Sequence, residues 1–176
     1  MTAMPPPPSQ PPSQPVPAPQ QPAGRYATWG SRAIAWLIDG AIVGAIAGVG
    51  IMMVAVAAAG TAAVSEGAGN AEPGAAGGVF LVLGLGLYAV AIGFNLWNQG
   101  WRQGETGQSI GKSVMKISVI RDTGEFMGGG LGIGRLLVNW IVGGACALNY
   151  LWPLWDDRVQ TWADKIVSTI VVETAP

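Results

Sequence analysis

The sequence predicts an all-α membrane protein with two transmembrane helices, a third helical segment that either spans or re-enters the membrane, and a small cytoplasmic β pairing. Three observations predict this class. Half of the 176 residues are apolar and only 11% are charged, whereas a soluble domain carries about 25% charged residues. Two long apolar segments are separated by a small, polar stretch. Tryptophans also gather near the ends of the apolar segments, where an indole keeps its ring in lipid and its N–H in water. These are Trp29, Trp36, Trp97, Trp101, Trp152, Trp155 and Trp162.

The composition excludes several classes of function. A formal net charge of −1 argues against a nucleic-acid partner held by bulk electrostatics. The chain has no histidine and one cysteine, Cys146, so we expect no internal disulfide, no metal site and no histidine-based catalysis. Asp39 and Asp164 could be drawn as an acid–base pair, but no nucleophile accompanies them. We therefore expect a protein that is not an enzyme and that uses no cofactor.

Residues 1–25 are predicted to form a disordered, Pro/Gln-rich cytoplasmic tail. Most of the thirteen prolines of the chain lie in its first 22 residues, mixed with glutamine and serine. Such a segment has nothing to bury and stays extended, in places as polyproline II. It could also serve as a docking tail for a partner that binds proline-rich peptides.

The first transmembrane helix is predicted over residues 33–59, which contain a single charge, Asp39. The second is predicted over residues 79–97. Because about 20 apolar residues cross a bilayer core, both segments are long enough. The connection between them contains Glu66 and Glu72 but no lysine or arginine.

The positive residues predict the orientation in the membrane. Basic residues lie before the first helix and after the second, and such residues mark the cytoplasmic side. They are Arg25, Arg32, Arg102, Lys112, Lys116 and Arg121. We expect a multi-pass plasma-membrane protein whose N-terminus is cytoplasmic and whose first loop lies outside.

The third membrane segment, residues 131–155, leaves two topologies open. It is long enough to cross once, but it carries Arg135, two asparagines and the pair Gly143-Gly144. Two β-branched runs flank it, at residues 114–120 and 166–172, and lone strands are barely stable unless they pair. If they pair, the third segment must enter and return, and both termini lie inside. We favour this second topology.

Glycines recur at every fourth position of the first helix, at Gly40, Gly44 and Gly48. This spacing makes a flat groove in which another backbone can approach closely. Three occupants are open: the second helix of the same chain through Ala89 and Gly93, a second copy of the chain, or a foreign subunit.

Asp39 is the candidate for an intramembrane site. It lies seven residues after Arg32, on the same helical face and ~10 Å deeper along the axis. An unpaired acid at the bilayer centre costs about 2.5–3.5 kcal/mol, so a partner is expected. We expect that partner to be Arg135, because the side chain of Arg32 leans away from Asp39 toward the helix N-terminus. The pair would be either a structural latch or an ion or proton site.

The stretch GETGQSIGKS, residues 104–113, superficially suggests a phosphate-binding loop. Such a loop needs a glycine five positions before Gly111-Lys112, and that position holds Thr106. Gly107 is one residue too close, so no nucleotide partner is expected. We expect the glycines to let the chain turn at the membrane surface and Lys112 and Lys116 to meet anionic headgroups or neighbouring acids.

Four pieces of sequence, in order, together resemble the RDD family of membrane proteins. The first piece is RAIAWLID, which contains Arg32 and Asp39, and the third is Arg135 at the head of the last segment. The second piece, GQSIGKSVMKISVIRDTG, is similar to the family pattern GQTIGKxxxGIRVVxxxG. The fourth piece, WDDRVQTWADKIVSTIVV, is similar to the family pattern DRRRQTxHDKxxxTxVV. The resemblance extends from about Tyr26 to Val172 and makes Asp164 the second aspartate of the family motif. This chain departs from the pattern at Trp162-Ala163, where the family often has a Leu-His pair, and at Met115-Lys116, where it often has a glycine.

The resemblance implies one membrane domain over residues 26–172, whose charge network comprises Arg32, Asp39, Arg135 and Asp164. The family has been proposed to transport unidentified ligands and includes members linked to sodium–proton exchange. Two hypotheses follow. The first is an accessory or scaffold protein that packs in the bilayer with itself or with a larger complex. The alternative is an oligomeric transporter coupled to protons or cations, in which Asp39 titrates.

Overall fold

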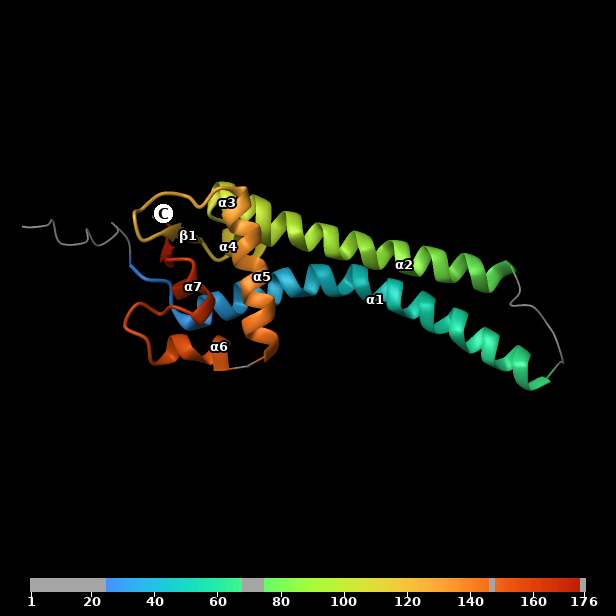
Figure 1. Ribbon diagram of the computed structural model, residues 1–176. Helices are drawn as coiled ribbons and strands as arrows, with labels where there is room; N and C mark the ends of the chain where they lie inside the picture. Colours follow the sequence, from blue (N-terminus) through green and yellow to red (C-terminus); the bar gives the residue numbers. More distant parts are fainter. Residues whose placement is uncertain (1–24, 68–74, 146–147, 175–176) are drawn as a thin grey trace, which may run out of the picture.

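The computed structural model describes residues 25–67, 75–145 and 148–174. Apart from Arg25, the predicted proline-rich tail lies outside the described residues, as do Glu72 and Cys146. Two long helices, α1 (Trp29–Gly67) and α2 (Ala75–Asn95), form a hairpin that extends away from the rest of the chain (Figure 1). All other elements gather at the end of the hairpin where α1 begins.

Both predicted transmembrane helices are confirmed as helices long and apolar enough to cross a membrane, over Trp29–Gly60 and Ala76–Thr106. The first begins earlier than the predicted residue 33 because Thr28 caps it, with its Oγ1 accepting from the Ser31 N–H at 3.2 Å. The second continues beyond residue 97 through a π-helical stretch, η1 (Leu96–Arg102), and α3 (Gln103–Thr106). Most large apolar side chains of both helices are exposed, as lipid-facing side chains are.

The two long helices meet at a pair of glycines that the sequence analysis did not single out. A Cβ atom on Gly50 would lie 2.7 Å from the Gly84 carbonyl oxygen, and one on Gly84 would lie 2.6 Å from the Gly50 oxygen. Gly84, Ala91 and Asn98 are buried at seven-residue intervals along α2 and η1, the repeat of two helices that wrap around each other. Of the three occupants left open for the face of Gly40, Gly44 and Gly48, the second helix of the same chain is excluded, because a Cβ on any of these glycines would meet no described atom within 4 Å.

The remaining elements follow η1 and α3 in chain order. They are α4 (Ile110–Val114), β1 (Ile117–Arg121), α5 (Gly129–Ala145), α6 (Leu148–Leu151), η2 (Trp152–Leu154), α7 (Trp162–Ile166) and β2 (Thr169–Glu173).

The predicted β pairing is confirmed. β1 and β2 are antiparallel, with Ile117 opposite Glu173 and Arg121 opposite Thr169. The segment before α1 joins them, because the Ala27 N–H donates to the Val171 oxygen at 2.9 Å and the Glu173 N–H donates to the Arg25 oxygen at 2.8 Å. Both ends of the described chain therefore lie side by side.

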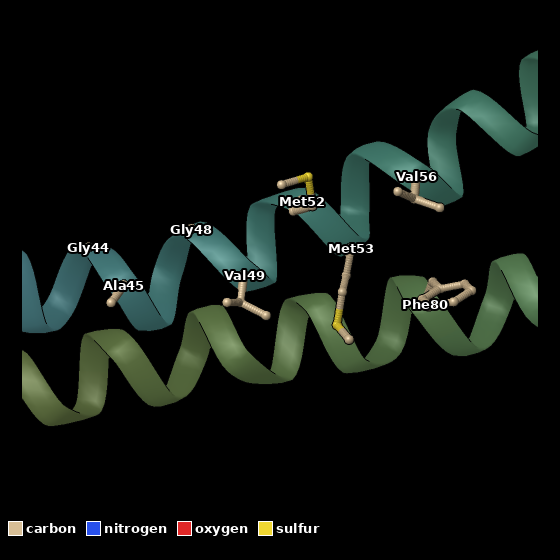
Figure 2. Close-up of a pocket in the computed structure, with 8 residues that line it drawn as sticks. All are labelled: Gly44, Ala45, Gly48, Val49, Met52, Met53, Val56 and Phe80. Atoms are coloured by element: carbon tan, nitrogen blue, oxygen red, sulfur yellow. The ribbon is translucent and has the colours of Figure 1, made fainter.

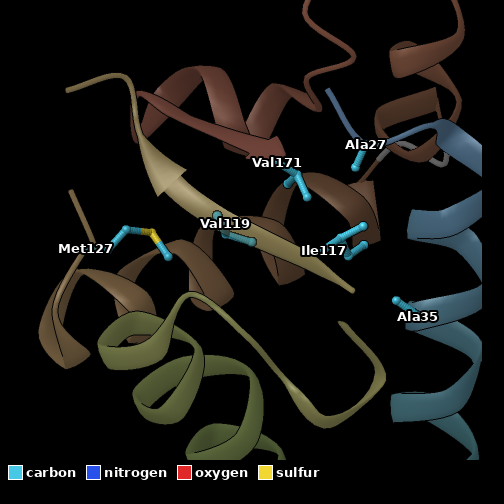
Figure 3. Packing of buried hydrophobic residues seen from close by; sticks show 6 residues of the cluster. All are labelled: Ala27, Ala35, Ile117, Val119, Met127 and Val171. Carbon is cyan, nitrogen blue, oxygen red and sulfur yellow. The ribbon is translucent and has the colours of Figure 1, made fainter. Parts of the chain in front are cut away.

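A small apolar core joins this sheet to the first turns of α1 (Figure 3). Its buried members come from both strands, α1, the segment before α1 and the segment before α5. They are Ala27, Ala35, Ile117, Val119, Met127 and Val171. The core therefore holds the two strands, and the segments before α1 and before α5, against the first turns of α1.

The third segment is a bent pair of helices rather than one straight span. α5 runs across the two long helices (Figure 1) and is bent by 112° from the helical segment Leu148–Leu154. Close backbone contact holds it there, since a Cβ on Gly132 would lie 2.2 Å from the Gly100 oxygen of η1. Since β1 and β2 pair, the chain leaves and re-enters the same end of the hairpin.

Candidate functional site

Asp39 is completely enclosed and is held by hydrogen-bond donors rather than by a cation. The residue as a whole is 1% exposed. Oδ1 accepts from the Asn98 side-chain amide and from the Gly111 backbone N–H, both at 2.8 Å, and Oδ2 accepts from the Ser109 hydroxyl at 2.5 Å. Three donors, from Asn98 in η1, Ser109 before α4 and Gly111 in the first turn of α4, thus satisfy the acid that the sequence predicted to need a partner.

Glycine at position 111 makes this contact possible. A Cβ on Gly111 would lie 2.0 Å from the Ala35 carbonyl oxygen, so only glycine lets the loop backbone lie against α1. Gly107 turns the chain into this loop with a φ of +73°, a left-handed backbone conformation that favours glycine. Ser109 then caps α4, since its Oγ accepts from the Lys112 N–H at 3.3 Å. The stretch that suggested a phosphate-binding loop therefore wraps a carboxylate of its own chain.

The π-helical stretch brings Asn98 to the same carboxylate. Asn98 is fully buried and uses both ends of its amide: Nδ2 donates to Asp39, and Oδ1 accepts from the Ile110 N–H at 2.9 Å. π-Helical turns often occur at functional sites because they shift the side-chain register of a helix. Here the shift lets one side chain bridge α1 and the loop.

Asp164 is the centre of a second buried group, which contains both candidate arginines. The Arg32 Nη1 donates to Asp164 Oδ2 at 2.9 Å, and Arg135 donates to Oδ1 through Nε at 3.1 Å and through Nη2. Thr161 caps α7 in a capping box with Asp164. Burial raises the pKa of the Asp164 carboxyl, but Arg135 and Arg32 together hold that pKa well below its usual range.

The predicted pairing of Asp39 with Arg135 was therefore wrong. Asp39 and Arg135 lie near the same end of the hairpin, as expected, but Arg135 forms its ion pair with Asp164. Arg32 also pairs with Asp164, in agreement with its leaning away from Asp39. The four motif residues thus form two separate carboxylate sites rather than one network of direct contacts.

Lys112 interacts electrostatically with both carboxylate sites. Its Nζ donates to the Gln103 side-chain oxygen at 2.6 Å, and the ammonium is within electrostatic range of Asp39, Asp164, Arg32 and Arg135. Burial first and the charge of Arg135 second lower the pKa of Lys112 from 10.5 to about 7, against the opposite effects of the two aspartates. The hydrogen bond to a neutral amide, rather than to a carboxylate, leaves this lysine free to titrate near neutral pH.

The glycine face of α1 points away from α2. A Cβ on Gly40, Gly44 or Gly48 would meet no atom within 4 Å among the described residues. Gly44 and Gly48 line an open apolar groove of about 640 Å³. Figure 2 shows Met53 pointing from α1 toward α2, while Met52 points away from it. Phe80 of α2 lies at the far end of the groove.

Sequence reasoning missed Asn98, Gln103 and Ser109, which complete the polar site. Each is at most 1% exposed. The available signals were polar residues at the end of an apolar helix and a serine that opens the short helix Ile110–Val114. In the parts of the chain that the structure describes, no three Asp, Glu or Cys side chains gather as a metal site would require.

Comparisons with known proteins agree with the motifs. The family model described as "RDD family" matches residues 26–168. The "Proline-rich antigen" of Mycobacterium leprae (strain TN) is 43% identical over 94 residues, which cover 49% of this chain and 38% of that protein. The "Proline-rich antigen homolog" of Mycobacterium tuberculosis (strain ATCC 25618 / H37Rv) is 37% identical over 158 residues, which cover 86% of this chain and 65% of that protein. The matches thus span less than two thirds of these relatives, and no solved structure matches.

Proposed function

Because this chain belongs to the RDD family, we propose that it is an accessory protein of the bacterial plasma membrane without enzymatic activity. It associates through the glycine face of α1 with a second copy of itself or with a subunit of a larger membrane complex. One observation carries the proposal: Gly40, Gly44 and Gly48 leave their face uncovered by the described residues, and Gly44 and Gly48 line an apolar groove.

Helix association in lipid depends on close backbone approach more than on apolar burial, because lipid tails are as apolar as leucine. A face of glycines four residues apart offers such an approach. The contact of α1 with α2 uses Gly50 and Gly84 instead, so the glycine face is available to a partner helix.

We propose that the N-terminus is cytoplasmic. The basic residues of the chain belong to segments that gather at one end of the hairpin (Figure 1), and the far end of the hairpin carries none. Such an asymmetry supports placing that end on the cytoplasmic side.

The test is the oligomeric state of the chain and of two matched variants. Gly44→Leu fills the glycine face, and Gly86→Leu adds the same side chain to α2, where a Cβ also meets no described atom within 4 Å. We expect crosslinking in native membranes to trap the wild type and Gly86→Leu in complexes and Gly44→Leu at least about tenfold less. A monomeric, uncrosslinked wild type, or equal behaviour of the two variants, would refute the proposal.

The ion-coupled transporter is the second candidate. The observation that favours it is the gathering of Arg32, Asp39, Lys112, Arg135 and Asp164 at the base of two membrane-spanning helices. The test is sodium-driven proton flux in proteoliposomes that contain a pH dye. We expect Asp39→Asn to abolish the flux; an unchanged flux would exclude Asp39 as the titrating group.

A further inference from the structure

One edge of the Arg32 guanidinium lacks a partner. Its Nη1 donates to Asp164, but Nε and Nη2 are buried and have no hydrogen-bond acceptor among the described residues. Buried donors are almost always paired, because an unpaired one costs about 1–3 kcal/mol. The N–H groups of Nε and Nη2 point in the same direction and form the fork that matches two oxygens of a phosphate or carboxylate.

The neighbouring carboxylates are already engaged. Asp164 accepts from both arginines and from the Thr161 N–H, and Asp39 accepts from Asn98, Ser109 and Gly111. Both carboxylates therefore already accept hydrogen bonds from other donors, and neither accepts one from Nε or Nη2 of Arg32.

The charges of the cluster also do not balance. Three cationic side chains, Arg32, Lys112 and Arg135, lie near two carboxylates, Asp39 and Asp164. A third carboxylate, Asp156, also acts on Arg32, but its charge is matched by its ion pair with Lys165. When Lys112 is protonated, one positive charge is left over in a largely buried setting, where uncompensated charge is costly. An anion on the free edge of Arg32 would remove this imbalance.

The position of Arg32 favours a phosphate over other anions. Arg32 lies in the first turn of a membrane-spanning helix that begins at Trp29. Trp29 is itself partly exposed, and its Nε1 donates to the backbone carbonyl oxygen of Tyr150 at 2.9 Å. Tryptophans of this kind mark the depth of the lipid headgroups, where phosphodiesters are the abundant anions. The Arg32 side chain is 12% exposed, so it lies close to the surface, and a phosphate would have to displace the neighbours that cover Nε and Nη2.

We propose that the Nε/Nη2 edge of Arg32 is a binding site for one phosphate group, supplied either by the headgroup of an anionic phospholipid or by free phosphate. The phosphate oxygens accept from both N–H groups and offset the surplus charge of the cluster. This site is separate from the glycine face, so the two proposals can fail independently.

The first experiment compares bound lipid by native mass spectrometry. The full chain is purified from mixed phosphatidylglycerol and phosphatidylcholine bilayers into detergent. We expect one retained phosphatidylglycerol per wild-type chain. Arg32→Lys keeps the charge and the reach to Asp164 but removes the fork, and we expect it to retain at least about tenfold less. Arg158→Lys is the matched control at an exposed arginine and should retain as much as the wild type.

Adding inorganic phosphate, against chloride at equal ionic strength, separates the two sources. Displacement of the lipid by phosphate shows that a free ion occupies the site. Retention of phosphatidylglycerol despite phosphate shows that the headgroup is the ligand. The proposal is overturned if the wild type prefers neither phosphatidylglycerol over phosphatidylcholine nor phosphate over chloride, or if Arg32→Lys binds as the wild type does.

A second measurement locates the phosphate without changing Arg32, in case Arg32→Lys does not fold. With Cys146 replaced by serine, a spin label at Trp29→Cys lies one helical turn from Arg32, and a label at Val82→Cys lies on α2. We expect the first label to broaden the phosphorus resonance of the bound phosphate and the second to leave it sharp. Equal broadening by the two labels would place the phosphate elsewhere and overturn the site.

Discussion

The guanidinium of Arg32 donates to the carboxylate of Asp164 at 2.9 Å, across 132 residues of sequence. This contact joins the first turn of α1 to α7, close to the end of the described chain. Because Arg135 of α5 binds the same carboxylate, one buried aspartate ties together three helices. Asp39, two turns deeper in α1, ties the same helix to η1 and to the start of α4.

Replacing Asp39 by alanine should destabilise the protein strongly. The change leaves the donors of Asn98, Ser109 and Gly111 without their acceptor, and each buried unpaired donor costs about 1–3 kcal/mol. We expect the free energy of unfolding in detergent micelles to fall by about 3 kcal/mol or more. Asp39→Asn, which keeps one acceptor oxygen, should cost less. Equal losses for the two variants would contradict the donor-based account of the site.

Gly111→Ala should detach the loop from α1. The added methyl would lie 2.0 Å from the Ala35 oxygen, and relieving such a clash costs about 1–3 kcal/mol. Gly86→Ala is the matched control on α2, where an added Cβ meets no described atom within 4 Å, and should be neutral or slightly stabilising. Thermal unfolding followed by tryptophan fluorescence measures both changes. A neutral Gly111→Ala would show that the loop does not need this close approach.

Double-mutant cycles should separate the two carboxylate sites. Arg135→Met combined with Asp164→Asn should show a coupling energy of about 1 kcal/mol or more, because the side chains are in direct contact. Arg135→Met combined with Asp39→Asn should be additive within about 0.5 kcal/mol. Coupling in the second cycle as large as in the first would restore the Asp39–Arg135 pair that the sequence suggested.

Stability should rise with pH above neutrality because of Lys112. The pKa of its ammonium is about 7 in the folded protein, against 10.5 as the ordinary value. Between these pH values the unfolded chain binds more protons than the folded chain, so the free energy of unfolding increases with pH. We expect the unfolding midpoint to rise from pH 7 to pH 9.5 in the wild type.

Lys112→Gln should flatten that rise, and Lys116→Gln, at an exposed position, should keep it. Parallel pH profiles for the wild type and Lys112→Gln would show that another group is responsible.

The long helices and the strand pairing could be predicted because their signals are local. The single charge in residues 33–59 and the β-branched runs around Ile117 and Ile170 can each be recognised within a short window. Asp164 was found through the motif that contains it. Each of these features depends on residues that are close in sequence, so the sequence alone was sufficient to predict it.

The partners of the site residues could not be predicted in the same way. Asn98 and Gly111 reach Asp39 across 59 and 72 residues, and the register of Asn98 depends on a π-helical stretch that no sequence period indicated. The contact between Gly50 and Gly84 could not be predicted either, because the point at which two helices cross depends on the side chains of both helices. The more regular series at Gly40, Gly44 and Gly48 indicated a packing face but not its occupant.

The hydrogen bond from the Glu173 N–H to the Arg25 oxygen has a practical consequence for work on this protein. A fluorescent or enzymatic reporter fused ahead of Arg25 and one fused beyond Thr174 would emerge from nearly the same point. The two fusions should therefore report the same compartment, and split halves of one reporter attached at these positions should reassemble within a single chain.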